Sequence, residues 1–172
     1  MKELVAKLEG LLRLRSIPFG MKLYETVAAM EAIPKIRRPK ESVHTLDQIV
    51  AQAARLGWTV GITTQDLVGD QCRSVVGLGG QDEKWYSGQH MVNVWFATPV
   101  DASAHQKAMN VVPAGKYKAL AVAPLASGRL DPPDIALFYA TPGAMIYFIN
   151  GLQYSGYKRF DWSVVGESAC AD

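Results

Sequence analysis

The sequence has few cysteines and little net charge. Only two cysteines, Cys72 and Cys170, occur among its 172 residues, and they lie far apart in the chain. This count excludes a disulfide-rich secreted scaffold and predicts unpaired thiols in a reducing compartment. Basic residues exceed acidic residues only slightly, with a formal net charge of +2. Such a balance predicts neither nucleic acid nor an anionic membrane surface as a partner.

The familiar catalytic signatures are also missing. The sequence contains no Gly-x-Ser-x-Gly, His-Glu-x-x-His, Walker or Cys-x-x-Cys pattern, each of which would have indicated a chemistry. The three histidines, His44, His90 and His105, are not spaced like metal ligands. The glycines within 77–80 follow a predicted helix, whereas a phosphate-binding loop follows a strand and begins a helix. We interpret them as a helix end and a turn.

Charged residues are absent from Ile135 to Tyr157, a stretch long enough for a transmembrane helix. The sequence Thr141-Pro142-Gly143 interrupts this stretch in the middle, and polar residues follow in its second half. Two buried elements of a soluble core explain the stretch better than a membrane span. The N-terminal residues are charged and lack the apolar core of a signal peptide. We therefore expect a cytoplasmic protein without a membrane partner.

Two apolar runs, 117–123 and 135–140, predict the centre of the fold. Both are short, continuous and bounded by turn residues, which is typical of strands buried on both faces. Thr141 and Pro142 predict a helix over 142–152, because threonine caps a helix and proline fits its first turn. This helix is apolar on all sides, so we expect it to cover the sheet, a pocket or a subunit interface.

The length and composition predict one domain, residues 1–172. Hydrophobic residues make up 49% of the chain and charged residues 20%, which are ordinary globular values for a chain that can bury a sizeable core. The expected class is α/β or α+β, with a mixed central β-sheet covered by helices.

Periodicity and turn residues predict the remaining elements. Helices are expected over 2–15, from the Thr45–Gln48 capping box to Gly57, over 71–77 and over 101–109. Strands are expected over 19–24, 58–62, 91–97 and 158–165. An aromatic and polar loop is expected over 85–90, and a last helix is expected to begin after Gly166.

A basic loop with two prolines is expected over residues 34–43, with four cations between positions 35 and 40. Such a cluster can contact phosphate groups. No aromatic or glycine platform accompanies the cations in the sequence, and a solvated loop is therefore the better interpretation.

The two cysteines have similar sequence surroundings. Cys72 lies at the start of a predicted helix, next to Arg73, and Cys170 follows Gly166-Glu-Ser. A helix N-terminus and an adjacent cation both lower the pKa of a thiol, so a reactive thiolate and a buried small residue remain alternatives for Cys72. Two thiolates do not complete a zinc site or an iron–sulfur cluster. Metal binding would therefore need ligands in addition to this pair.

A polar elbow, residues 127–134 (Ser-Gly-Arg-Leu-Asp-Pro-Pro-Asp), separates the two apolar runs. Arg129 either forms an internal pair with Asp131 or Asp134, or holds a carboxylate or phosphate of a ligand through its planar set of donors. Lys22, within strand 19–24, either faces solvent or meets an anionic ligand. His90 is the best-placed histidine, because aromatic and polar residues flank it.

Four segments of the chain resemble the bacterial and archaeal family called domain of unknown function 169. They are Ile17–Lys22, the Cys72 helix with Gly77-Leu78, Ala123–Asp134 and Gly166–Asp172. The resemblance adds weight to Cys72, Arg129, Asp131 and Cys170 as site residues, but it implies no reaction. It also implies that family members continue beyond the Gly-Glu-Ser-Ala-Cys segment, so a site that needs that part would be incomplete in this chain.

Two functional hypotheses follow. The first is a cytoplasmic enzyme, or enzyme subunit, that binds a small anionic molecule near Arg129, with thiolate, zinc or iron–sulfur involvement. Its candidate residues are Cys72, Arg129 and Asp131 for catalysis, Lys22, Arg73, Arg129 and His90 for ligand binding, and Cys72 with Cys170 for a metal. The second is a non-catalytic ligand-binding or protein-interaction module, with helix 142–152 as the contact of a homo-oligomer.

Overall fold

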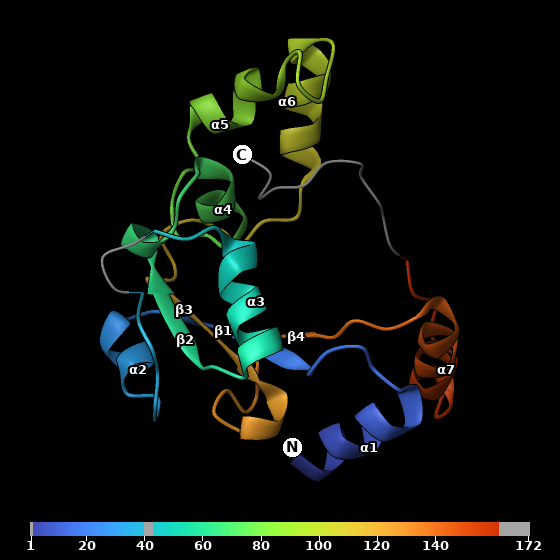
Figure 1. Cartoon of the computed structure of the whole chain (residues 1–172). Helices are drawn as coiled ribbons and strands as arrows, with labels where there is room; N and C mark the ends of the chain where they lie inside the picture. The colour runs from blue at the N-terminus through green and yellow to red at the C-terminus, as the bar shows by residue number, and fades with distance from the viewer. Residues whose placement is uncertain (1, 40–42, 162–172) are drawn as a thin grey trace.

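The computed structural model describes residues 2–39 and 43–161, which form an α+β fold (Figure 1). The helices within these residues are α1 (Lys2–Leu12), α2 (Val27–Glu31), α3 (Leu46–Leu56), α4 (Asp70–Val75), α5 (Glu83–Ser87), α6 (Pro99–Ala108) and α7 (Pro142–Gln153). The strands are β1 (Phe19–Tyr24), β2 (Val60–Thr63), β3 (Ala119–Pro124) and β4 (Ile135–Leu137). Short 3-10 helices are η1 (Thr64–Asp66), η2 (Gln89–Met91) and η3 (Leu125–Ser127). The predicted class is confirmed as α+β.

The four strands form one sheet in the order β2-β3-β1-β4. All three ladders between these strands are antiparallel, so the prediction of a mixed sheet was wrong. The two strands predicted from the apolar runs, β3 and β4, are not neighbours. β1 lies between them and pairs with each in the antiparallel sense: Phe19 lies opposite Pro124 of β3 and opposite Leu137 of β4.

β3 is buried on both faces, as its apolar run predicts. On one face, Ala119, Ala121 and Ala123 belong to a cluster with residues of α2. On the other face, Leu120 and Val122 belong to the larger core, to which α3 contributes. The small alanines allow α2 to approach the sheet closely, and Figure 1 shows α3 lying along the strands on its own face. β3 thus contributes side chains to both hydrophobic clusters, one on each face of the sheet.

α3 has the boundaries that its sequence predicts. The side chain of Gln48 accepts a hydrogen bond from Thr45 N at 3.1 Å, as expected for a capping box. The helix ends at Gly57, whose φ of 68° lies in the left-handed region that glycine adopts without steric cost. Ile49 and Ala53 face the core. α3 is therefore a helix with both ends capped and one side packed against the core, and its other sides can line a site.

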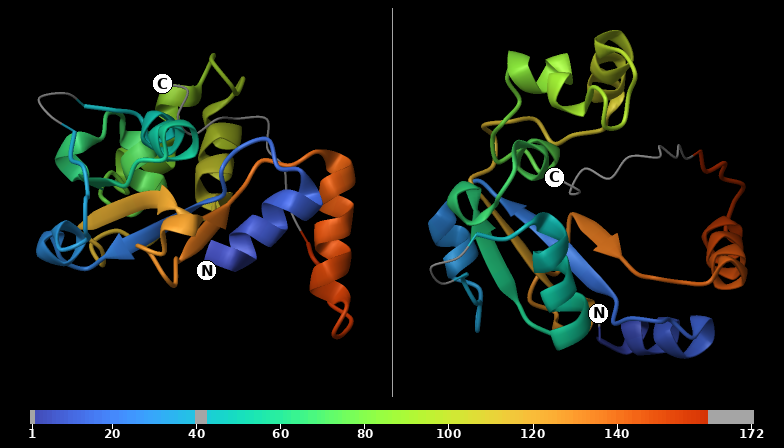
Figure 2. Two further views of the ribbon diagram at one scale, coloured as in Figure 1. Left: turned by 60° about the horizontal axis from the view of Figure 1, so that its bottom comes forward. Right: turned by 45° about the horizontal axis from the view of Figure 1, so that its top comes forward.

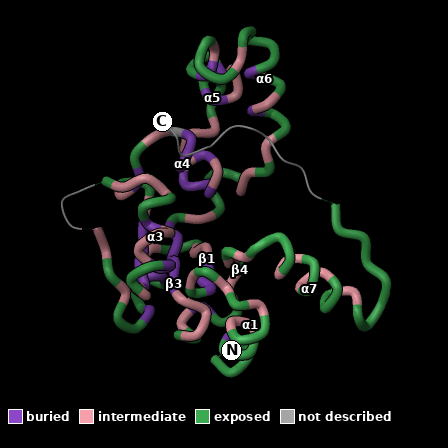
Figure 3. Tube along the Cα trace, turned by 45° about the vertical axis from the view of Figure 1, so that its right-hand side comes forward, coloured by how far each residue is buried: buried purple, intermediate pink, exposed green. Residues whose placement is uncertain are grey.

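β4 and α7 are exposed, contrary to the expectation of buried elements. β4 is an edge strand whose Ile135 remains 44% exposed. Thr141 caps α7 as predicted, accepting a hydrogen bond from Ala144 N at 3.3 Å. However, α7 has no buried residue, and it stands beside α1 rather than over the sheet (Figures 2 and 3). Each face of the sheet is already covered by another helix, one face by α3 and the other by α2.

Residues 85–97 differ from the prediction of a loop followed by a strand. Residues 83–87 are helical because Asp82 caps α5, accepting a hydrogen bond from Trp85 N at 2.9 Å. After Met91 the chain turns: the N–H groups of residues 94, 95 and 96 all donate to Met91 O. Asn93 has a φ of 64°, which an extended strand does not allow. The apolar residues of 91–97 are therefore used in a compact turn.

The two ends of the described chain also differ from expectation. α1 ends at Leu12 instead of residue 15, because Arg13 adopts a left-handed φ of 48°. Residues 158–161 form no strand in the structure, and the rest of the predicted strand 158–165 and the last predicted helix lie outside the described residues. None of the described helices is long and apolar enough to cross a membrane.

Candidate functional site

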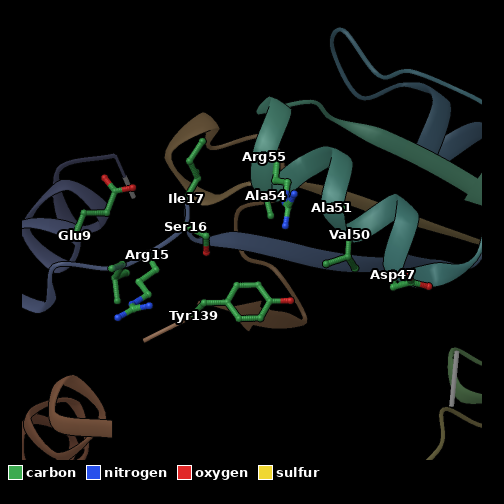
Figure 4. Close-up of a pocket in the computed structure, with 11 residues that line it drawn as sticks. Glu9, Arg15, Ser16, Ile17, Asp47, Val50, Ala51, Ala54, Arg55 and Tyr139 are labelled. Atoms are coloured by element: carbon green, nitrogen blue, oxygen red, sulfur yellow. The ribbon is translucent and has the colours of Figure 1, made fainter. Parts of the chain in front are cut away.

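An open groove of about 870 Å³ lies between the end of α1, one side of α3 and the segment that follows β4. We call it the α1–α3 groove (Figure 4). Its apolar lining is Leu14, Ile17, Val50, Ala51 and Ala54, and its polar lining is Glu9, Arg15, Ser16, Asp47, Arg55 and Tyr139. The groove is large enough for a small organic ligand, for which sites of about 300–1,000 Å³ are usual.

The chain between α1 and β1 forms one wall of this groove. After the left-handed Arg13 ends the helix, Arg15 N donates a hydrogen bond to Tyr139 O at 3.2 Å. This bond joins the segment before β1 to the segment after β4, which are far apart in the sequence. The ring of Tyr139 also lies against Phe19, with centroids 6.3 Å apart. The groove therefore depends on the pairing of β1 with β4.

Ser16 and Arg55 give this groove its chemistry. The hydroxyl oxygen of Ser16 is buried and has no hydrogen-bond partner among residues 2–39 and 43–161, a situation that costs free energy unless a partner is supplied. Arg55 is in the last turn of α3, and Figure 4 shows its side chain leaving the helix toward the space bounded by Ser16 and Tyr139. Within the described part of the chain, no ion pair or hydrogen bond engages the guanidinium groups of Arg15 or Arg55.

Sequence analysis missed this groove. Arg15, Ser16 and Tyr139 occur at the ends of predicted elements, and Arg55 is an ordinary helix-end arginine. No motif joins them, because three separate segments supply them. The only signal in the sequence was the polar pair Arg15-Ser16 immediately before an apolar strand, which is too common to single out a site.

The elbow, which the sequence favoured, makes internal contacts. The guanidinium Nη1 of Arg129 donates a hydrogen bond to Thr59 Oγ1 at 2.6 Å, and Thr59 is buried. Neither Asp131 nor Asp134 forms an ion pair with Arg129 among the described residues, and Asp131 is exposed. Arg129 thus ties the elbow to the start of β2 instead of pairing with Asp131 or Asp134.

Lys22 and Asp134 fasten the other half of the elbow to β1. Lys22 Nζ donates to Pro132 O at 2.8 Å, and Asp134 Oδ2 accepts from Leu23 N at 2.8 Å. The elbow passes so close to β1 that a Cβ on Gly20 would lie 2.9 Å from Pro133 Cβ. Lys22, for which the sequence left a solvated face and an anionic ligand as alternatives, donates to a loop carbonyl in this structure.

The same carboxylate affects a neighbouring tyrosine. Partial burial raises the pKa of Tyr24 above its ordinary value of 10.0, and the negative charge of Asp134 raises it further. Both effects disfavour the phenolate. Tyr24 is thus neutral at physiological pH and belongs to the support of the elbow.

Cys72, Arg73 and His90 lie in a different part of the molecule. β2 runs from the elbow end of the sheet, where Thr59 meets Arg129, to the opposite end, where η1 and α4 follow. Cys72 is buried, with only 3% of its surface exposed. The guanidinium of Arg73 donates to Leu67 O at 3.1 and 2.9 Å. The structure therefore separates these residues from Arg129 and Asp131.

His90 takes part in a buried amide network between α4, α5 and α6. Its Nε2 contacts Nε2 of Gln71, whose Oε1 accepts from Trp85 Nε1 at 2.7 Å and from Gln106 Nε2 at 3.3 Å. Gln71 and Gln106 are both buried. This network joins α4, α5 and α6, which lie in the upper part of Figure 1. The expected loop over 85–90 instead contains the end of α5, a turn at Gly88 and the start of η2.

The metal prediction rests on Cys170, which lies outside the described residues. Within residues 2–39 and 43–161, no group of three or more histidine, cysteine, aspartate or glutamate side chains is arranged to hold a metal ion. Cys72 alone supplies one sulfur ligand there, and a zinc or iron–sulfur site needs three or four.

Comparison with known proteins identifies one family. A family model described as DUF169, uncharacterised ArCR, matches residues 7–172. No curated protein and no solved structure matches the chain. The match covers nearly the whole chain, including the α1–α3 groove and the elbow.

Proposed function

Because the chain belongs to the family of domain of unknown function 169, whose description names no activity, we propose a function from the geometry: the protein binds a small anionic molecule in the α1–α3 groove. The observation that carries this proposal is the buried hydroxyl of Ser16, in the wall of a groove that also contains Arg15 and Arg55; none of these three side chains has a hydrogen-bond or ion-pair partner within the described part of the chain. Sequence analysis placed the ligand at the Arg129 elbow. The internal contacts of Arg129 and Lys22 move the proposal to Arg55.

The lining of this groove indicates a carboxylate with an aliphatic body. Arg55 offers a planar set of N–H donors, which suits a carboxylate in a two-point arrangement. The walls beside it are the aliphatic side chains of Ile17, Val50, Ala51 and Ala54. The Ser16 hydroxyl, which has no partner among the described residues, would form a further hydrogen bond to the carboxylate. Glu9 and Asp47 at the groove's margins disfavour ligands with several negative charges.

Titration calorimetry with hexanoate as the probe tests this proposal. We expect binding to the wild type and a loss of affinity of about tenfold or more in Arg55→Met, since a hydrogen bond to a charged group contributes about 1.5–3 kcal/mol. Ser16→Ala should weaken binding by a smaller factor. Arg13→Met is the matched control, because Arg13 is exposed and is not part of the groove lining. Equal affinities for the Arg55 and Arg13 variants would refute the site.

We further propose a catalytic role for the cysteines. It rests on Cys72 and Cys170 as thiolates or as ligands of zinc or an iron–sulfur cluster, completed by residues beyond those described. The small number of cysteines, two far apart in the sequence, favours reducing, cytoplasmic conditions. Metal analysis of anaerobically purified protein, with Cys72→Ser as the comparison, tests it: stoichiometric metal that disappears in the variant would support an enzyme, and metal-free protein would argue against one.

A protein-interaction module is the second candidate function, and the exposure of α7 favours it. Ile146 and Tyr147 on this helix are 60% and 74% exposed, and no charged residue interrupts the surface from Ile135 to Tyr157. Homodimer interfaces are richer in apolar area than ordinary protein surface. Sedimentation analysis of the wild type and of Ile146→Lys tests this alternative: a dimer that the substitution converts to a monomer would support it, and a wild-type monomer at high concentration would contradict it.

A further inference from the structure

A second groove, also of about 870 Å³, lies on the other side of α3. We call it the Arg37 groove. The segment that precedes α3 runs along the outer edge of β2: Arg37 N donates to Thr59 O at 2.8 Å, and Gly61 N donates to Arg37 O at 2.9 Å. Side chains from this segment, from the end of α3 and from the start of β2 enclose the groove, among them Ile36, Arg37, His44, Leu56 and Trp58.

Arg37 and Trp58 form a flat, positively charged shelf in this groove. The guanidinium carbon of Arg37 lies 4.1 Å from the centroid of the Trp58 ring, a cation–π arrangement that leaves the in-plane N–H donors of the arginine available. Basic loops contact phosphate most effectively when an aromatic platform accompanies them. The sequence shows no such platform within residues 34–43, but the fold supplies one from the end of α3.

The two arginines beside this shelf differ in their ion-pair partners. Arg38 is paired with Glu31 and Asp66, each at 2.7 Å. Among the described residues, Arg37 has no acidic partner and no aspartate or glutamate lines the groove. The α1–α3 groove differs, because Glu9 and Asp47 accompany its two arginines. The Arg37 groove therefore presents an unpaired guanidinium to an anionic group of a ligand.

Two nitrogen atoms in the wall also lack partners. Nδ1 of His44 and Nε of Arg38 are buried and make no hydrogen bond to any residue that the structure describes. Both residues line the groove. A polar wall with unfilled hydrogen-bonding capacity, opposite the apolar side chains of Ile36 and Leu56, is an arrangement that small-molecule sites use for orientation.

We propose that the Arg37 groove binds a flat aromatic ring that carries one anionic group, either a carboxylate or a phosphate. The ring packs on the Arg37–Trp58 shelf and against Leu56. The anionic group meets the in-plane donors of Arg37 on the side of His44. This site is independent of the α1–α3 groove, from which α3 separates it.

Calorimetric titration with three probes tests the proposal: 2-naphthoate, AMP and the non-planar cyclohexanecarboxylate. We expect 2-naphthoate or AMP to bind the wild type and cyclohexanecarboxylate to bind at least tenfold more weakly. The tighter of the two aromatic probes identifies the anionic group as a carboxylate or a phosphate. Failure of both aromatic probes to bind at millimolar concentration, or equal affinity for the saturated ring, would overturn the proposal.

Two substitutions locate the site. Arg37→Met should reduce the affinity for the aromatic probe at least tenfold, and Trp58→Leu should do the same. Because Trp58 also packs against the core, Arg37→Met decides the matter if Trp58→Leu does not fold. Arg55→Met is the control: it should leave aromatic-probe binding unchanged while it weakens hexanoate. An aromatic probe that responds to Arg55 and not to Arg37 would show that only the α1–α3 groove binds ligands.

Discussion

The elbow and the α1–α3 groove contain similar chemical groups, yet they are used differently. The elbow has Arg129 and Asp134 in a compact, proline-rich segment, and both side chains bind neighbouring strands. The groove has Arg55 and Ser16 on separate elements, and neither side chain has a hydrogen-bond partner within the described residues. A dense polar motif is therefore weak evidence for a ligand site when the same residues fasten the fold.

This difference between support and site can be tested by separating stability from binding. Substitutions in the elbow should lower the free energy of unfolding and leave ligand affinity unchanged in the remaining folded protein. Substitutions in the groove should lower the ligand affinity and leave the free energy of unfolding nearly unchanged.

The largest effect on stability is expected at the closest approach of the elbow to the sheet. In Gly20→Ala, the new Cβ would lie 2.8 Å from Leu125 Cδ2 and 2.9 Å from Pro133 Cβ. We expect a loss of about 1–3 kcal/mol in the free energy of unfolding, measured by urea denaturation, because a well-packed contact must be displaced. Gly10→Ala is the control in open space on α1, where alanine should stabilise by up to about 1 kcal/mol. Equal effects of the two substitutions would show that the elbow does not constrain β1.

A somewhat smaller effect is expected for Arg129→Met. This substitution leaves the buried Thr59 hydroxyl without its donor, which should cost about 1–2 kcal/mol of unfolding free energy. In the double variant with Thr59→Val, most of this loss should be recovered, since neither polar group then remains unpaired. Additive losses, together with weakened hexanoate binding in Arg129→Met, would instead restore Arg129 as a ligand residue.

The groove arginine should contribute little to stability. Arg55 is exposed and unpaired within the described part of the chain, so Arg55→Met should change the free energy of unfolding by less than about 0.5 kcal/mol. Urea denaturation checks this on the same samples used for hexanoate titration. A loss as large as that of Arg129→Met would indicate that Arg55 also supports the fold.

The smallest effect is expected from Tyr24, and it is confined to alkaline pH. Because the folded protein raises the pKa of Tyr24 above 10.0, the neutral phenol is favoured by folding. Its contribution is fully present below pH 10 and is lost as the pH rises through the raised pKa. Tyr24→Phe should therefore flatten the decline in unfolding free energy above pH 10. An unchanged decline would assign the effect to other groups.

Local signals predicted the elements that depend on neighbouring residues. The capping pair Thr45 and Gln48 located α3, and Thr141 with Pro142 located the start of α7. The apolar run 119–123 identified the most buried strand. These predictions succeeded because capping and strand burial are decided by short stretches of sequence.

Predictions failed where an element's surroundings decide its state. The apolar surface of α7 predicted burial, but the sheet has no free face for it once α2 and α3 are in place. The apolar residues 91–97 predicted a strand, but three hydrogen bonds to Met91 O fold them into a turn. Composition shows which side chains would gain from burial, but it does not show which of them find a place in the core.

The sequence by itself determined a fold with both helices and strands, the family, the boundaries of α3 and the start of α7. Only the tertiary structure decided where grooves form. Both grooves combine side chains from separate segments around α3, such as Ser16 with Arg55 and Arg37 with Trp58. The tertiary structure also assigned Arg129 to Thr59. The physical reason is that hydrogen bonds and ion pairs depend on distance in space. Whether a polar side chain has a partner therefore depends on residues that are distant in the sequence.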